Sequence, residues 1–163
     1  MLFLHGGGEV GCPSNGGIYN NERPIWLGGK LFRDKVDQGA FDGFLLYPQY
    51  VIAQGCFGGW LGAPADDFHS IFAIIDSMAK YARADIDRVV ANGLSGGGYG
   101  CFRAITGWPQ RIAKIIPTST WGPTGGKNAF VHIPIWFATG QLDAEPSPEQ
   151  AQTCVNQMRS IGA

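Results

Sequence analysis

The sequence predicts an α/β fold, in which a mostly parallel sheet carries helices on both of its faces. Apolar, strand-like segments alternate along the chain with helices or long crossover segments. Most of these segments are continuously apolar, which is typical of strands that are buried on both sides. The chain has 163 residues, so we expect a single domain, residues 1–163, around one core.

The first part of the chain combines short strands with long loops. We expect a strand at 1–5, a glycine-rich loop at 6–17, a weak helix at 24–36, a second strand at 43–47 and a loop at 48–64. Gly28 and Gly29 interrupt the helical pattern. The last loop is long enough to suggest a functional role.

The rest of the chain alternates between helix and strand. We expect helices at 65–81, at 96–106 and from 148 onward, and strands at 88–92, 112–116 and 133–139. The helix at 65–81 is the clearest, because its apolar residues recur every three or four positions: Phe68, Ile71, Phe72, Ile75 and Met78. Ser147 and Gln150 form a capping box with Pro148 at the first helical position, and Cys154, Met158 and Ile161 share one face of that helix.

Composition narrows the possible functions. The 12 Lys and Arg residues nearly balance the 13 Asp and Glu residues, which argues against a nucleic-acid partner. No apolar run is long enough to cross a bilayer, so no membrane partner is expected. Charged residues make up only 15% of the chain, and together with the many aromatic residues and glycines this favours a secreted or extracytoplasmic protein.

The four cysteines do not predict a metal site. Cys12, Cys56, Cys101 and Cys154 form no CxxC pair and no metal-ligand spacing, so we expect neither a metal ion nor another cofactor. Four cysteines allow three disulfide pairings, and the sequence does not choose among them. We expect most of them to be small buried apolar residues.

Residues 89–98 carry the strongest chemical signal. An apolar strand runs directly into Gly93-Leu94-Ser95-Gly96-Gly97, which is a Gly-x-Ser-x-Gly pattern. This pattern is typical of a nucleophile elbow, a strained strand-to-helix turn that lifts a serine hydroxyl above the sheet. Such a pattern arises by chance in a glycine-rich chain, but its place between a strand and a helix makes Ser95 the candidate nucleophile.

A second motif follows the first expected strand. His5-Gly6-Gly7-Gly8 matches a loop whose backbone N–H groups help to form an oxyanion hole, with Gly6 or Gly7 and Gly96 as the donors. The stretch from Gly6 to Gly11 also satisfies the dinucleotide fingerprint G-x-G-x-x-G. That fingerprint needs a helix to begin at this point, and Pro13 with the polar loop around it forbids one.

An acid lies where a catalytic triad would need one, but no histidine does. Asp143 closely follows the strand expected at 133–139, and an isolated Asp in such a loop either orients a histidine or simply caps the loop. His5 belongs to the glycine loop, His69 is expected to be solvated, and His132 is expected to be structural. None of them follows Asp143, where the base of such a triad is expected.

Taken together and in order, these segments resemble the α/β-hydrolase superfamily. The likeness is greatest to its esterase branch: phospholipase/carboxylesterase-like proteins, "predicted peptidases" and polyhydroxybutyrate-depolymerase or feruloyl-esterase-like proteins. The matching segments are residues 2–11, Leu46-Tyr47-Pro48-Gln49 with Trp60, residues 85–100, Trp108-Pro109, and residues 133–143. Against that family, the chain lacks the first strands and the last strand, and we expect it to be incomplete at both ends.

The resemblance implies a serine carboxylesterase. Ser95 would be the nucleophile, Asp143 the triad acid, and Gly6, Gly7 and Gly96 the oxyanion region. A histidine would take the Ser95 proton, and water would then release the acid from the acyl-enzyme. The expected substrate is a small-molecule or polysaccharide-linked ester.

Other interpretations stay open at this point. Trp60 and Trp121, with Tyr50 and Phe57, either line a substrate pocket or pack within their loops. A degenerate, non-catalytic binding module could use the same scaffold. Peptidase activity is a third hypothesis, with no support in the sequence. The oligomeric state is not predicted.

Overall fold

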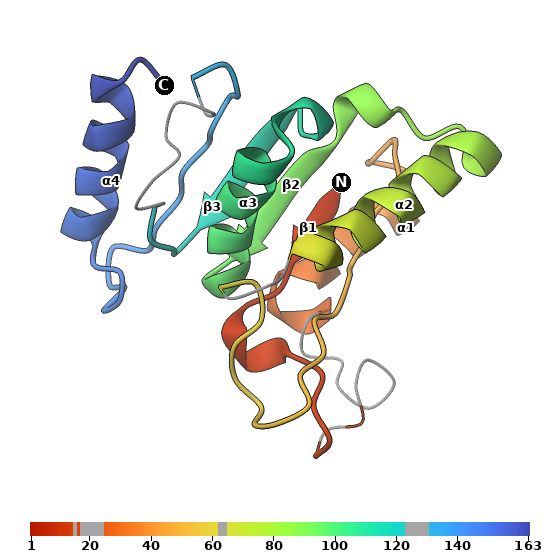
Figure 1. Ribbon diagram of the computed structural model, residues 1–163, viewed down its shortest axis with the longest axis horizontal. Coiled ribbons are helices and arrows are strands. Elements are labelled where there is room, and N and C mark those ends of the chain that lie inside the picture. Colours follow the sequence, from red (N-terminus) through yellow and green to blue (C-terminus); the bar gives the residue numbers. More distant parts are fainter. Residues whose placement is uncertain (15, 17–24, 62–64, 123–130) are drawn as a thin grey trace.

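A computed structural model describes residues 1–14, 16, 25–61, 65–122 and 131–163. Its centre is a parallel sheet of three strands in the order β1 (Leu2–Leu4), β2 (Val90–Leu94) and β3 (Lys114–Thr118) (Figure 1). In register, Leu2 pairs with Ala91, which in turn pairs with Ile115. The parallel α/β architecture that the sequence predicts is therefore confirmed.

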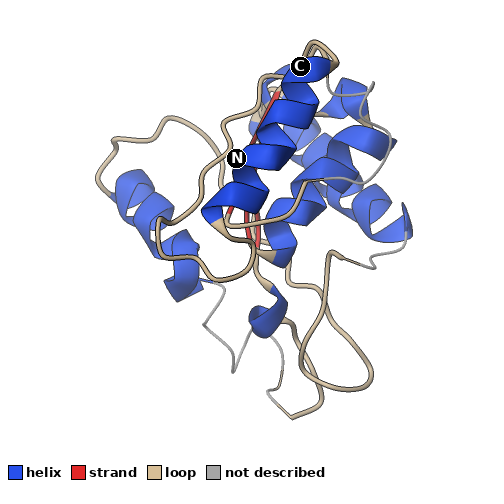
Figure 2. Ribbon diagram, turned by 90° about the vertical axis from the view of Figure 1, so that its left-hand side faces the viewer, coloured by secondary structure: helices blue, strands red, loops and turns tan. Residues whose placement is uncertain are grey.

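Alternating side chains of β1 bring helices to both faces of the sheet. Leu2 and Leu4 join the main core, which also contains residues from α2 (Ala65–Ala82) and α3 (Gly96–Gly107). Phe3 points the other way and packs on Phe32 of α1 (Lys30–Asp37), with 6.3 Å between ring centroids. Figure 2 shows helices on opposite sides of the strands.

The helix predictions are confirmed with small shifts. In α2, Phe68, Ile71, Phe72 and Ile75 are buried along one face, and Met78 is half-buried. A π-helix at Ile25–Gly29 leads into α1, while position 24 lies outside the described residues. The helix α4 (Pro148–Ser160) begins with the expected capping box and buries Ala151, Cys154 and Met158. No described helix has the length and apolar character that a membrane crossing needs.

A short 3-10 turn precedes each of the strands β2 and β3. Residues Ile86–Arg88 form one turn, capped by Asp85, whose side chain accepts a hydrogen bond from the Asp87 N–H at 2.9 Å. Residues Pro109–Arg111 form another. Strands β2 and β3 therefore each begin two residues later than the sequence patterns predict.

The prediction of a strand at 43–47 is wrong, because only one residue of this segment pairs with the sheet. Leu46 forms an isolated parallel bridge with Leu2, and Pro48, which follows closely, has no N–H to extend a ladder. The strand predicted at 133–139 is also reduced to two bridges, at Ile135 and Ala138.

Pro117 explains the interrupted pairing beside β3. The Ile115 N–H donates to Pro134 O, the Trp136 N–H to Ile115 O, and the Ala138 N–H to Pro117 O. A regular parallel ladder would need a donor at position 117 between these bonds, and Pro117 has none. The segment 133–139 therefore runs beside β3 without becoming a continuous strand.

Candidate active site

Ser95 occupies a sharp turn between β2 and α3. Its backbone has φ 54° and ψ −117°, in a region that residues other than glycine rarely adopt. The Ser95 N–H donates to Thr118 O at 2.9 Å, which fastens the turn to the end of β3. The serine thus lies at the carboxyl edge of the sheet, in the strained conformation that the Gly-x-Ser-x-Gly pattern predicts.

Two glycines allow this turn to form. A Cβ atom added to Gly93 would overlap the carbonyl group of Gly97, and one added to Gly97 would overlap the carbonyl oxygen of Leu4. Neither obstacle is a flexible side chain, so neither position accepts a larger residue. The first turn of α3 is therefore in main-chain contact with β1 and β2.

Residues 5–12 and 49–60, here called the loop pair, run side by side below the sheet in Figure 1. Hydrogen bonds join them at several points: Tyr50 N–H to His5 Nε2 at 2.9 Å, Gln49 Nε2 to Glu9 O at 3.1 Å, Gly11 N–H to Tyr50 O at 2.8 Å, Ile52 N–H to Gly11 O at 2.9 Å, and Gly58 N–H to Gly7 O at 3.0 Å. The Cys12–Cys56 disulfide adds a covalent link. The sequence predicts none of these links.

The disulfide corrects the prediction for the cysteines. Only Cys101 and Cys154 lie outside this disulfide, and both are buried, as expected for small apolar residues. Burial raises the pKa of the Cys101 thiol well above its usual range, so this cysteine stays protonated. Among the described residues, no cluster of His, Cys, Asp and Glu side chains could hold a metal ion.

His5 is a structural link in the loop pair. Its Nδ1 lies 2.7 Å from Gly6 O, which can only accept, so Nδ1 carries the proton. Its Nε2 then accepts the hydrogen bond from the Tyr50 N–H. Burial lowers the pKa of His5, and the hydrogen bond to Gly6 offsets part of that effect. Both ring nitrogens are occupied by main-chain partners.

The glycines expected to stabilise an oxyanion come together. A Cβ atom added to Gly96 would lie 3.5 Å from Gly7 N, so the start of α3 faces the first loop directly. Gly6 adjoins the side chain of Glu9, because a Cβ atom there would lie 2.6 Å from Glu9 Oε2. Glu9 is 7% exposed, and sequence reasoning did not single it out.

Asp143 is held by one of its carboxylate oxygens. Its Oδ2 accepts hydrogen bonds from Ser119 Oγ at 2.7 Å, from the Gly140 N–H at 2.8 Å and from Thr139 Oγ1 at 3.1 Å. These donors, that of Ser119 first, lower the pKa of Asp143, while partial burial opposes them. The carboxylate is therefore ionised and fixed at the edge of the sheet.

Ser119 is a site residue that sequence reasoning missed. It directly follows β3, as Ser95 directly follows β2, and its backbone φ is also positive, at 48°. The carboxyl ends of parallel strands meet at one edge of a sheet, so a polar residue at this position was a signal available in the sequence.

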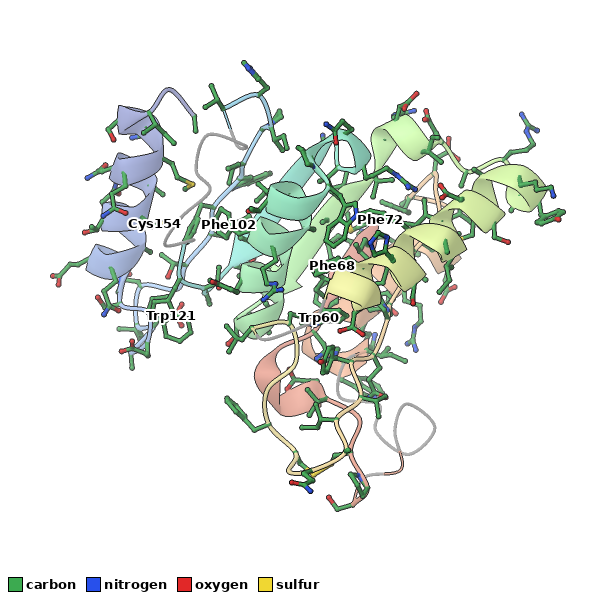
Figure 3. All side chains as sticks on the ribbon, viewed as in Figure 1. Trp60, Phe68, Phe72, Phe102, Trp121 and Cys154 are labelled. Atoms are coloured by element: carbon green, nitrogen blue, oxygen red, sulfur yellow. A yellow bond between two sulfur atoms is a disulfide. The ribbon has the colours of Figure 1, made fainter. Side chains whose placement is uncertain are left out.

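The candidate pocket residues have different environments. Trp60 is 1% exposed and packs on His5, Tyr50 and Phe68 (Figure 3). Of the two interpretations of this residue, its environment favours packing within the loops over lining a pocket. Trp121 is 38% exposed, lies near α4 in Figure 3, and donates from Nε1 to Glu145 Oε1 at 3.3 Å. Phe57 is 78% exposed, which makes it the most exposed of the four aromatic candidates Tyr50, Phe57, Trp60 and Trp121.

The other two histidines are exposed, and the structure gives neither of them a contact with Ser95 or Asp143. His69, on α2, makes an edge-to-face contact with Trp108, with 5.2 Å between ring centroids. His132 lies at the amino end of the segment 133–139, away from the carboxyl edge where Ser95 lies. The structure therefore brings Ser95, Asp143 and the three glycines to one edge of the sheet, without a histidine between them.

Comparison with known proteins identifies the fold. No protein-family model and no curated protein sequence matches the chain. A thermostable esterase superposes on 99% of the chain with a TM-score of 0.73 and 25% identity, and the chain spans 43% of that protein.

Two more distant structures support the fold alone. SOBER1 of Arabidopsis thaliana covers 99% of the chain with a TM-score of 0.62 and 18% identity, and the chain spans 83% of it. A mutant feruloyl esterase module from Clostridium thermocellum, in complex with sinapinate, also covers 99%, with a TM-score of 0.54 and 17% identity, and the chain spans 60% of it. The chain therefore has the α/β-hydrolase fold, and its structural neighbours include esterases.

Proposed function

We propose that this protein is a serine hydrolase that cleaves carboxylic esters through an acyl-enzyme on Ser95. The Ser95 hydroxyl attacks the ester carbonyl, and its proton passes to a histidine base. Backbone N–H groups of Gly96 and of Gly6 or Gly7 receive the developing oxyanion. Asp143 orients the base and stabilises its positive charge. Collapse of the tetrahedral intermediate breaks the ester C–O bond, and the alcohol leaves with the proton that the histidine returns to it. Water, deprotonated by the same histidine, then attacks the acyl-enzyme and releases the carboxylic acid, and the Ser95 oxygen regains its proton.

The observation that carries this proposal is the conformation of Ser95. A serine with φ 54° at the carboxyl edge of a parallel sheet, beside Gly7 and at the start of a helix, is costly to maintain for structure alone. The esterase likeness agrees with this interpretation. The ionised Asp143 also agrees with it, because Ser119, at the end of the neighbouring strand β3, holds this carboxylate by a hydrogen bond.

We assign the role of base to none of the three described histidines. The ring nitrogens of His5 bind Gly6 and Tyr50, and removal of either bond would disturb the loop pair. His69 and His132 lie on other parts of the surface. The proposal is therefore tested on the natural polypeptide, with any residues that its coding region supplies after position 163.

The test combines ester hydrolysis with labelling by a fluorophosphonate, which reacts covalently with activated serines. The protein with Ser95 should hydrolyse a small acyl ester and become labelled. The Ser95→Ala variant should not be labelled, and its kcat/KM should fall at least about 10³-fold, as when a triad nucleophile is removed. Ser77→Ala, an exposed change on α2, is the matched control and should keep both activities.

The alternatives predict other outcomes. A non-catalytic module would show neither labelling nor hydrolysis, with the Ser95 turn intact. A peptidase would be labelled at Ser95 and cleave peptides but not small esters. Hydrolysis that survives Ser95→Ala would contradict the proposed nucleophile.

A further inference from the structure

Phe57 combines high exposure with a fixed position. The side chain is 78% exposed, although a lone apolar ring gains nothing from contact with water. Its ring nevertheless lies directly against Gly7, because a Cβ atom added to Gly7 would lie 3.1 Å from Phe57 Cζ and 3.2 Å from Cε2. The ring therefore covers one side of a glycine that we place in the oxyanion region.

Links on both sides of Phe57 hold the ring there. The preceding residue, Cys56, is bound covalently to Cys12. The following residue, Gly58, donates its N–H to Gly7 O at 3.0 Å. Gly58 has φ 141°, a conformation that side chains disfavour, so the turn after the ring depends on glycine. The exposed ring thus stands on a loop with little freedom to move.

The same short stretch faces the start of α3. A Cβ atom added to Gly96 would lie 3.5 Å from Gly7 N and 3.8 Å from Gly58 O. If the reacting carbonyl oxygen rests between the N–H groups of Gly7 and Gly96, a group attached to that carbonyl passes beside the Phe57 ring. This placement of the carbonyl rests on the proposed function.

We propose that Phe57 is a specificity-determining residue of the substrate site, held in place by the Cys12–Cys56 disulfide. Its ring favours esters with a bulky apolar acyl group over the acetate of the same alcohol. Contact of an apolar group with a fixed aromatic ring removes both surfaces from water and gives roughly a twofold to tenfold gain in binding. A mobile ring would lose part of this gain to its own ordering.

The test measures selectivity rather than activity alone. The ratio of kcat/KM for ethyl cyclohexanecarboxylate to that for ethyl acetate is compared among variants of the natural polypeptide. Phe57→Ala should lower this ratio about threefold to tenfold, with less than a twofold change for the acetate. Tyr81→Ala, which removes a ring of matching exposure (76%) from α2, should leave the ratio unchanged.

The disulfide is tested by the double variant Cys12→Ser, Cys56→Ser. It should lower the same ratio in the direction of Phe57→Ala, although Phe57 itself is present. Where this variant does not fold, a dithiol added to the folded wild-type protein gives the second measurement. That reagent reduces the disulfide to two thiols and is itself oxidised to a cyclic disulfide. A ratio that stays unchanged after loss of the disulfide would overturn its assigned role.

Binding without turnover separates this inference from the proposed function. The dissociation constant of cyclohexanecarboxylate, followed by NMR, should rise about threefold or more in Phe57→Ala and stay unchanged in Tyr81→Ala. This binding result in a protein that hydrolyses no ester would support the Phe57 site while contradicting the Ser95 mechanism. Equal ratios and equal dissociation constants in wild-type and Phe57→Ala proteins would overturn the inference.

Discussion

The two sides of Ser95 are held in different ways. On one side, the loop pair is joined by a disulfide and by hydrogen bonds spread from His5 to Gly58. On the other side, one carboxylate oxygen of Asp143 accepts three hydrogen bonds, two from the neighbouring residues Thr139 and Gly140 and one from Ser119 at the end of β3. The first side holds main chain in place, whereas the second holds a single side chain.

This difference follows from what each side supplies. Backbone N–H donors move only when the chain moves, so their position requires links along a whole loop. A carboxylate is positioned by the groups that donate to it. Single substitutions should therefore lower catalysis strongly around Asp143, and change it little where they remove only one of the links that join the loop pair.

The largest expected effect is that of Asp143→Asn. The amide oxygen can still accept from Ser119, but the neutral side chain cannot stabilise a positively charged base. We expect kcat/KM to fall on the order of 10⁴-fold, with a melting temperature close to that of the wild-type protein. Glu149→Gln, which removes a charge from the first turn of α4, should leave kcat/KM unchanged. A loss below tenfold would show that Asp143 only shapes its loop.

A smaller effect is expected from Ser119→Ala. The Ser119 hydroxyl is the first cause of the lowered pKa of Asp143, so its removal should raise that pKa toward the ordinary value. Because the carboxylate loses one of the groups that hold it in place, kcat/KM should fall about threefold to tenfold at neutral pH. The pKa itself is measured from the carboxyl carbon shift of Asp143 by NMR. An unchanged pKa would remove Ser119 from the site.

The smallest expected effect lies in the loop pair, at His5. Burial lowers the pKa of His5 in the folded protein, so the unfolded chain binds its proton more readily. The stability contributed by neutral His5 is complete above pH ~6.5 and falls as the pH drops toward the lowered pKa. Between pH 7.5 and pH 5, the melting temperature of the His5→Gln variant should fall by roughly 2–4 °C less than that of the wild-type protein.

His69→Gln provides the matched control for this measurement, because His69 is exposed. Its melting temperature should follow the wild-type pH dependence. Equal pH slopes in His5→Gln and wild-type proteins would contradict the assignment of His5 as a neutral link. A loss of hydrolysis as large as that of Asp143→Asn would contradict the comparison between the two sides.

Sequence patterns predicted the features that depend on local chemistry. The apolar runs located β1, β2 and β3, and helical spacing located α2 and α4. The glycines around Ser95 predicted a strained turn, and Ser95 has the positive φ that such a turn needs. The assignment of Ser95, Asp143 and the glycines to catalysis stays a prediction.

Features that depend on distant partners were beyond the sequence patterns. The pairing of Cys12 with Cys56 joins residues 44 positions apart, and nothing local distinguishes it from the other pairings. The segment 133–139 has the apolar pattern of a strand, but Pro117, on its neighbour, interrupts the ladder. Trp60 lies in a loop by sequence, yet it packs among core residues of α2 and β1.

The contact at Gly93 and Gly97 has a consequence for how Ser95 tolerates change elsewhere. The spacing between α3 and the sheet is set there by main-chain atoms, which every sequence shares, and not by the volume of side chains. Substitutions among apolar core residues such as Phe102 or Ile105 alter packing farther along α3. Such substitutions should therefore leave the position of Ser95 relative to the sheet unchanged. The apolar core of this protein can vary in composition without displacing the serine.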